Sequence, residues 1–194
     1  MNRRNFLQRG AVAATGISLS SSLLEDPSIV LGQGNKRYRL DTAWGKLDFS
    51  RYPVKDCHEM VQDRSGRIYL LTNETRNNVL VYNKKGKLLD AWGTEYPGGH
   101  GLTLFDENGE EFLYICDNNR HQVIKTTLKG KVVMTLDYPK ETGEYTKADE
   151  YIPTETTIAP NGDIYVADGY GKDFIIQYDS KGRYIRHFGG RGTE

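Results

Sequence analysis

The stretch that decides the fold is Gly162-Asp-Ile-Tyr-Val-Ala-Asp168-Gly-Tyr-Gly-Lys-Asp-Phe-Ile-Ile-Gln-Tyr178-Asp-Ser-Lys-Gly182-Arg-Tyr-Ile-Arg-His-Phe-Gly189. It consists of an apolar run, a polar loop that begins at Asp168, a second apolar run, a turn that ends at Gly182, and a third apolar run. The β-branched and aromatic residues of these runs are typical of strands, and the Asp-Ser-Lys-Gly turn is typical of a hairpin. The stretch therefore predicts a small antiparallel sheet, with little helical periodicity to compete.

The same pattern recurs earlier in the chain, and this repeat is the main evidence for the architecture. One copy begins at Gly66-Arg-Ile-Tyr-Leu-Leu and another at Glu111-Phe-Leu-Tyr-Ile-Cys, while residues 38–45 resemble the closing strand of a further copy. Antiparallel repeats of roughly 40–50 residues indicate the blades of a β-propeller. We therefore predict an all-β chain of the β-propeller class over residues 35–194.

The number of repeats predicts an arc and not a closed ring. Residues 38–194 hold about three blades and a spare strand, whereas closed propellers have roughly 4–8 blades. An open arc would leave strand edges unprotected, so we expect the chain to be the N-terminal part of a larger propeller. Self-association of arcs is the alternative. The polar insert at residues 137–151 is expected to be either a mobile loop at one end of the propeller or an ordinary linker.

Composition excludes some classes of function. The formal net charge is +0, which argues against nucleic acid as a partner because a basic face would then be expected. No segment is a definite membrane span, and 21 Gly with 13 Tyr suit a turn-rich β protein. Cys57 and Cys116 are expected to be free, buried thiols, since no metal-binding spacing is present.

Residues 1–34 are predicted to be an export signal and linker. Asn2-Arg3-Arg4-Asn5-Phe6-Leu7 precedes a weakly apolar run at residues 11–20. Paired arginines followed by such a run resemble a twin-arginine signal, which predicts a periplasmic or extracellular protein. The alternative is a basic, amphipathic start to a cytoplasmic protein.

Two histidines are candidate metal ligands. His58 and His100 lie 42 positions apart, each shortly before the Asp that opens a turn. In a propeller such positions begin the innermost strand, so that side chains from different blades meet around the central channel. Converging imidazoles could bind zinc or another divalent metal; the alternative is a pair of hydrogen-bonded channel histidines. For His121 and His187 we predict no role.

Four segments resemble peptidyl-α-hydroxyglycine α-amidating lyase, a six-bladed propeller of NHL-type repeats. They are His100-Gly-Leu-Thr-Leu, Arg120-His-Gln-Val-Ile-Lys, Pro153-Thr-Glu-Thr-Thr-Ile and Tyr165-Val-Ala-Asp-Gly-Tyr. The resemblance covers about residues 55–192 and implies that three of six blades are present. It also implies a carbon–nitrogen lyase that converts a C-terminal α-hydroxyglycine into a peptide amide and glyoxylate.

The resemblance implies roles for particular residues. His100 would be one of three zinc-binding histidines, and the backbone carbonyl of Leu102 would bind a structural calcium. Tyr170 would be the catalytic base, although a packing aromatic is the alternative. The family's first catalytic arginine has no clean counterpart, because Asn73 occupies the simplest alignment and Arg76 lies close by. We take Arg76 as the candidate.

Other features of the sequence limit the resemblance. Gly171 stands where the family has a cysteine, so the family's disulfide is absent. Asp117, Asp168 and Asn73 begin equivalent loops, and turn chemistry explains them better than a carboxylate site. One or two imidazoles cannot enclose a catalytic metal, so we expect an incomplete active site in this chain.

Two functions remain open at this point. The first is a lyase that acts on a small peptide or another small molecule in the propeller channel. The second is a non-catalytic scaffold that binds a peptide, a glycan or a protein. A truncated, inactive product of a longer gene is a third reading.

Overall fold

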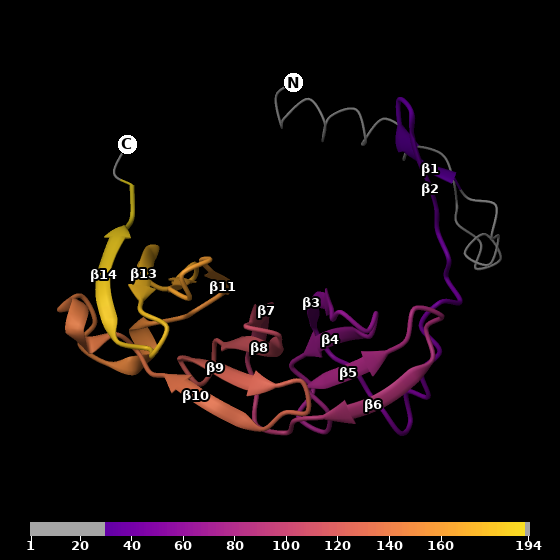
Figure 1. The fold of residues 1–194 in the computed structure, drawn as a ribbon, viewed down its shortest axis with the longest axis horizontal. Helices are drawn as coiled ribbons and strands as arrows, with labels where there is room; N and C mark the ends of the chain where they lie inside the picture. Colours follow the sequence, from indigo (N-terminus) through magenta and orange to yellow (C-terminus); the bar gives the residue numbers. More distant parts are fainter. Residues whose placement is uncertain (1–29, 193–194) are drawn as a thin grey trace. The chain divides into compact units, whose positions relative to one another are not determined.

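The computed structural model describes residues 30–192 (Figure 1). The chain divides into two compact units, Met1–Trp44 and Gly45–Glu194, which we describe separately. The predicted twin-arginine segment lies mostly at residues 1–29, outside the described residues. Among the described residues, no helix is long and apolar enough to cross a membrane.

The first unit contains a short hairpin, and here one prediction is wrong. Strand β1 (Val30–Gln33) pairs antiparallel with β2 (Lys36–Arg39). We had expected residues 38–45 to close a blade, but their first residues belong to a local two-stranded sheet, and residues 40–45 form no strand. A connection of two residues lets β2 pair with its sequence neighbour, and all four β2 residues are exposed. Local pairing therefore prevails over the repeat pattern.

The second unit contains three four-stranded antiparallel sheets, which confirms the predicted all-β fold built of blades. The first sheet comprises β3 (Cys57–Gln62), β4 (Ile68–Thr72), β5 (Val79–Tyr82) and β6 (Leu88–Trp92). The second comprises β7 (Gly99–Glu107), β8 (Glu110–Asp117), β9 (Gln122–Thr127) and β10 (Val132–Leu136). The third comprises β11 (Glu155–Ile158), β12 (Ile164–Ala167), β13 (Phe174–Tyr178) and β14 (Tyr184–Gly189).

The predicted hairpin turns occur at the expected places. In the first sheet, the side-chain oxygen of Asn83 accepts hydrogen bonds from the backbone N–H groups of Lys85 and Lys87. Asp179 does the same in the third sheet for Lys181 and Arg183. A short side-chain acceptor at the start of the turn compensates backbone donors that the strand ladder leaves unpaired. The repeated turn sequence therefore has a repeated structure.

Apolar side chains fill the spaces between successive sheets. One buried cluster joins the first two sheets and includes Leu71, Val81, Leu113 and Ile124. A second joins the last two sheets and includes Tyr114, Val123, Val166 and Ile176. Burial of these faces is the main stabilising term for stacked blades. The strands β3, β7 and β11 also lie side by side at the inner edges (Figure 1).

The insert at residues 137–151 packs against the third sheet. It contains two short 3-10 helices, η2 (Lys140–Thr142) and η3 (Ala148–Glu150). Tyr145 and Tyr151 are buried in the same cluster as the sheet residues, and the Tyr145 hydroxyl donates to Asp168 at 2.7 Å. The insert is thus a folded part of the sheet's surroundings and not merely a linker.

The cysteines form no disulfide with each other. Cys116 is buried, and burial raises the pKa of its thiol well above the ordinary value. Cys57 is exposed, so the prediction that both thiols are buried is wrong for Cys57. It lies at the first position of the inner-edge strand β3, whereas Cys116 lies in the central strand β8.

Candidate functional site

His58 and His100 meet where adjacent inner strands begin. Their rings stack with centroids 4.2 Å apart and an interplanar angle of 28°. The pairing of β3 shifts register between Cys57 and Glu59, and that of β7 shifts between Gly99 and Leu102. Such irregularities redirect side chains and are frequent beside functional sites. They place both imidazoles at one edge of the inner strands.

The hydrogen bonds of His100 select one tautomer of its neutral ring. Its Nδ1 lies 2.9 Å from the backbone oxygen of Thr154, and its Nε2 lies 3.2 Å from the hydroxyl oxygen of Tyr170. A carbonyl oxygen can only accept, so Nδ1 must carry the proton. In the neutral ring Nε2 is then an acceptor, and the Tyr170 hydroxyl donates to it. Nε2, which faces Tyr170, therefore carries the lone pair of the neutral ring.

Tyr170 reaches His100 from the loop between β12 and β13. The ring of Tyr170 meets that of His100 edge-on at 5.2 Å, and Tyr170 is 62% exposed. A packing aromatic would be expected to be buried, so its exposure favours a role for the hydroxyl. Tyr170 also borders a cavity of about 550 Å³, together with Ile152 and Phe174. Tyr170 thus contacts His100 through its hydroxyl and also borders a cavity.

Asp168 holds this loop in place. Its buried carboxylate accepts hydrogen bonds from the Tyr145 hydroxyl at 2.7 Å and from the Ile152 and Lys172 backbone N–H groups at 2.7 and 2.6 Å. A Cβ on Gly171 would lie 2.1 Å from the Asp168 carboxylate. Gly171 is therefore required for this close approach, and a cysteine could not replace it without rearrangement.

Of the two other loop starts, Asp117 behaves as the turn interpretation predicted and Asn73 does not. Asp117 accepts from the backbone N–H groups of Gly98, Asn119 and Arg120. Asn73 exchanges hydrogen bonds with Asp56 through its side chain. Asp117 therefore closes its own loop, whereas Asn73 connects its loop to a segment 17 positions earlier in the chain. Each side chain has its own partners, which does not support a shared carboxylate site.

Of the predicted metal ligands, only His100 is oriented as a ligand could be. The Thr154 backbone carbonyl fixes its Nδ1, as is common for metal-bound histidines, but its Nε2 is engaged by the Tyr170 hydroxyl. His58 stacks on His100 and does not face it across a common point, which is an unfavourable geometry for two ligands of one ion. Within residues 30–192 no group of three His, Cys, Asp or Glu side chains could hold a metal. The described residues alone therefore do not fit a complete zinc site.

Leu102 and Arg76 lie apart from the histidine–tyrosine contact. The Leu102 side chain is buried in the cluster between the first two sheets, and its backbone N–H donates to Glu59 at 2.8 Å. Arg76 lies in the loop between β4 and β5 and pairs with Glu74 at 3.1 Å. The structure thus gives Arg76 a local partner in its own loop.

A pair of glutamates from two blades meets beside this site, and sequence analysis missed it. Glu59 on β3 and Glu155 on β11 share a hydrogen bond, and Glu155 also accepts from the Thr103 hydroxyl at 3.0 Å. Burial and the nearby Glu59 together raise the pKa of Glu155 to about 7. The only sequence signal was the position of Glu155 inside Pro153-Thr-Glu-Thr-Thr.

The glutamate pair predicts a stability that depends on pH. The folded-state pKa of Glu155 lies above its unfolded value near 4.5. The stabilisation that the protonated Glu155 carboxyl gives the folded state is therefore fully present below about pH 4.5 and is lost as the pH rises through about 7. Between about pH 5 and about pH 8 we expect a loss on the order of 2 kcal/mol in the free energy of unfolding. Urea unfolding across this range should show the loss in the wild type and a flatter profile in Glu155→Gln, and equal slopes would contradict the assignment.

Gly101 lets β7 approach β11 closely enough to bring His100 to Thr154. A Cβ at Gly101 would lie 2.5 Å from the Thr154 backbone oxygen and 3.0 Å from the Glu155 Cα. We expect Gly101→Ala to lower the free energy of unfolding by about 2 kcal/mol and to shift the His100 ring signals in NMR spectra. Gly45→Ala is the control, because a Cβ there meets no atom within 4 Å. Equal stability of the two variants would show that the approach is not tight.

Three blade-like sheets, with a histidine on an inner strand that meets a tyrosine from the β12–β13 loop of the third sheet, define the chain as a β-propeller-type protein. Its relatives are α-amidating lyases and NHL-repeat proteins. It is 33% identical over 146 residues to a probable peptidyl-α-hydroxyglycine α-amidating lyase of Caenorhabditis elegans, covering 68% of this chain and 41% of the relative. It is 34% identical over 110 residues to peptidyl-α-hydroxyglycine α-amidating lyase 1 of Drosophila melanogaster, covering 54% of this chain and 19% of that relative. NHL repeat-containing protein 3 of Homo sapiens is 27% identical over 140 residues, covering 69% and 40%.

Solved structures agree with the fold. A streptogramin B lyase matches with a TM-score of 0.53 and 14% identity, over 70% of this chain and 41% of its own. A catalytically inactive virginiamycin B lyase from Staphylococcus aureus with quinupristin matches with a TM-score of 0.51 and 15% identity, over 79% and 44%. No family model matches the chain. The chain spans about two fifths or less of the length of the curated relatives it matches.

Proposed function

We propose that the protein is an exported lyase of the α-amidating type, which cleaves a C-terminal α-hydroxyglycine into an amide and glyoxylate. The observation that carries the proposal is the contact between His100 Nε2 and the Tyr170 hydroxyl. These residues belong to the two segments, His100-Gly-Leu and Asp168-Gly-Tyr, on which the resemblance depends most. The proposed location, periplasmic or extracellular, rests on the paired arginines at Arg3 and Arg4.

The reaction requires removal of one proton and delivery of another. As the substrate hydroxyl loses its proton, its C–O bond becomes the carbonyl of glyoxylate and the C–N bond breaks. The nitrogen gains a proton and leaves as the amide. A base near the hydroxyl and an acid near the nitrogen are therefore needed.

His100 and Tyr170 form a plausible route for the first proton. Because the Tyr170 hydroxyl donates to His100 Nε2, the phenol can pass its proton to the imidazole while its oxygen receives the substrate proton. The Thr154 carbonyl stabilises the resulting imidazolium by accepting from Nδ1. The cavity of about 550 Å³ beside Tyr170 provides room for the end of a peptide. The substrate class we propose is thus a small peptide or a similar small molecule.

Zinc and calcium belong to the proposal for the whole protein only. When bound, zinc would supply positive charge that favours the ionised substrate hydroxyl. The lone pair on His100 Nε2 cannot bind a metal ion and accept the Tyr170 proton at the same time. Metal binding at His100 would therefore release the Tyr170 hydroxyl from the contact described above. Because the described residues do not complete a metal site, the proposed proton route involves His100 and Tyr170 alone.

The second candidate is a propeller scaffold that binds a peptide, a glycan or a protein without catalysis. It is favoured by the Arg76 side chain, because this candidate catalytic residue pairs locally with Glu74. It is also consistent with the similarity to NHL repeat-containing proteins, whose names state no enzymatic activity.

The two candidates are distinguished by glyoxylate release. The complete protein that the natural gene encodes is incubated with a peptide ending in α-hydroxyglycine, with and without added zinc. The lyase proposal expects glyoxylate and the shorter amide in equal amounts. Peptide binding without glyoxylate, in protein that is folded and loaded with zinc, would favour the scaffold instead.

A further inference from the structure

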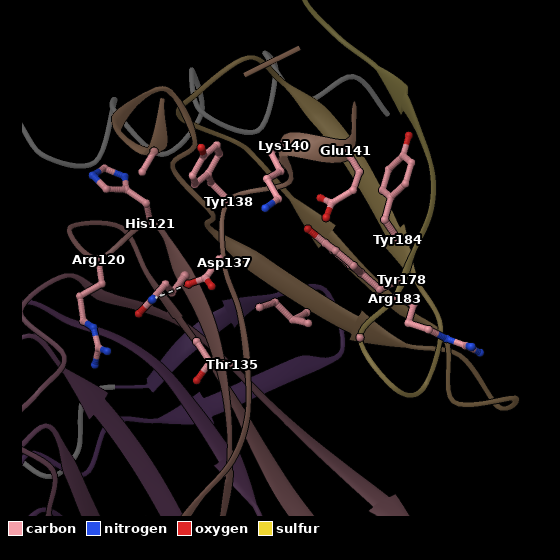
Figure 2. A pocket seen from close by; sticks show the side chains of 14 residues that line it. Arg120, His121, Thr135, Asp137, Tyr138, Lys140, Glu141, Tyr178, Arg183 and Tyr184 are labelled. Carbon is pink, nitrogen blue, oxygen red and sulfur yellow. Dashed lines mark hydrogen bonds between the residues drawn. The ribbon is translucent and has the colours of Figure 1, made fainter. Parts of the chain in front are cut away.

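A second cavity lies between the second and third sheets and contains none of the residues placed in the lyase site. Its volume is about 820 Å³ (Figure 2). The walls come from the loop between β8 and β9, the end of β10, the insert, the end of β13 and the turn before β14. Volumes of roughly 300–1,000 Å³ are typical of small-molecule sites.

The insert gives this cavity a defined wall. Asp137, Tyr138, Lys140 and Glu141 all line it. The insert is anchored at its far end, because the backbone oxygen of Tyr151 lies 2.7 Å from His121 Nδ1, another lining residue. The first two sheets are joined by a much shorter connection and have no corresponding insert.

Buried polar atoms in this cavity lack partners. Tyr178 is only 4% exposed, and its hydroxyl lies beside the buried Tyr151 hydroxyl without a hydrogen bond of ordinary geometry between them. Figure 2 shows this hydroxyl pointing into the cavity, toward the Glu141 carboxylate and the Lys140 ammonium. The Gln122 amide nitrogen donates to Asp137 at 2.7 Å, but its oxygen is buried without a donor. Leaving such groups unpaired costs about 1–3 kcal/mol each, so a ligand that satisfies them would be stabilised.

The charges around the cavity do not favour a phosphate or another strong anion. Two of the lining cations are engaged elsewhere, since Arg120 donates to the Glu95 backbone oxygen and Arg183 pairs with Asp179 at 2.6 Å. The Lys140 charge is opposed by the neighbouring Glu141. Burial raises the pKa of Tyr178, so its hydroxyl remains protonated and uncharged.

The free groups suit a ligand rich in hydroxyls. Tyr178 and Lys140 can donate, whereas Glu141 and the Gln122 oxygen accept. A sugar hydroxyl donates and accepts at once, so a saccharide can satisfy both kinds of group. The rings of Tyr138 and Tyr184 line the same cavity and offer flat apolar faces. We propose that this cavity is a binding site for a neutral saccharide, about the size of a disaccharide.

Isothermal titration calorimetry of the chain with cellobiose, maltose and chitobiose tests this site. We expect at least one of the three to bind with a dissociation constant in the millimolar range or below. Tyr178→Phe removes only the buried hydroxyl and should weaken binding about five- to tenfold. Tyr82→Phe is the matched control, since Tyr82 ends β5 as Tyr178 ends β13 but does not line the cavity. It should bind the sugar as the wild type does.

A second variant keeps the test decisive if Tyr178→Phe folds poorly. Lys140→Ala changes an exposed side chain and should weaken binding several-fold without loss of fold. Three results would overturn the proposal: no binding of any of the three sugars by the folded wild type, wild-type affinity in both variants, or binding of glycylglycine in their place. None of these results depends on glyoxylate release, so the saccharide site and the lyase proposal can fail separately.

Discussion

His100→Ala is expected to reduce glyoxylate release by the complete protein at least about 100-fold. The substitution removes His100 Nε2, which accepts the hydrogen bond of the Tyr170 hydroxyl. It also removes Nδ1, which the Thr154 carbonyl holds in place. Tyr170→Phe should cause a loss of similar size. Because Tyr170 is 62% exposed, removing its hydroxyl should change the free energy of unfolding little. The measurement is the initial rate of glyoxylate formation from an α-hydroxyglycine peptide.

His121→Ala is the matched control for His100→Ala. His121 lies in the loop between β8 and β9 and also meets a backbone carbonyl through Nδ1, but it lines the cavity of about 820 Å³. Its variant should keep the wild-type rate, provided that circular dichroism and thermal unfolding show an intact fold. If His100→Ala and Tyr170→Phe retained the wild-type rate, the histidine–tyrosine contact could not be the catalytic centre.

Asp168→Ala is expected to lower the free energy of unfolding by about 3–4 kcal/mol. Its buried carboxylate accepts three hydrogen bonds, so the substitution leaves the Tyr145 hydroxyl and the Ile152 and Lys172 N–H groups without their acceptor. Tyr145 lies within the insert and Ile152 directly follows it, whereas Lys172 lies in the same loop as Tyr170. We therefore also expect faster proteolysis of residues 137–151. Urea unfolding and limited proteolysis measure the two effects.

Asp179→Ala provides the comparison for Asp168→Ala. Asp179 also accepts two backbone N–H groups and pairs with Arg183, but it lies in a surface hairpin. Loss of its contacts to a solvated turn should lower the free energy of unfolding far less than loss of the Asp168 contacts does. If the two variants were equally stable, burial of the Asp168 network would not matter for the fold.

Local features of the fold could be predicted from the sequence. The hairpin turns at Asn83 and Asp179 depend on residues two to four positions apart, so the repeat pattern revealed them. The same reasoning assigned Asp117 and Asp168 to turns. It was wrong for residues 38–45, because a strand pattern does not state which strand is its partner. Strand β2 pairs with its neighbour β1 because the short connection between them is the easier loop to close.

The sequence by itself determined that the chain forms repeated antiparallel sheets, since alternation and turn residues act over a few positions. Only the tertiary structure decided which side chains meet. His100 and Tyr170 are 70 positions apart, and Glu59 and Glu155 come from different sheets. Their contacts depend on how the sheets pack and on register shifts in β3 and β7. No local pattern encodes such distances, because inner-strand packing and the close approach at Gly101 set them.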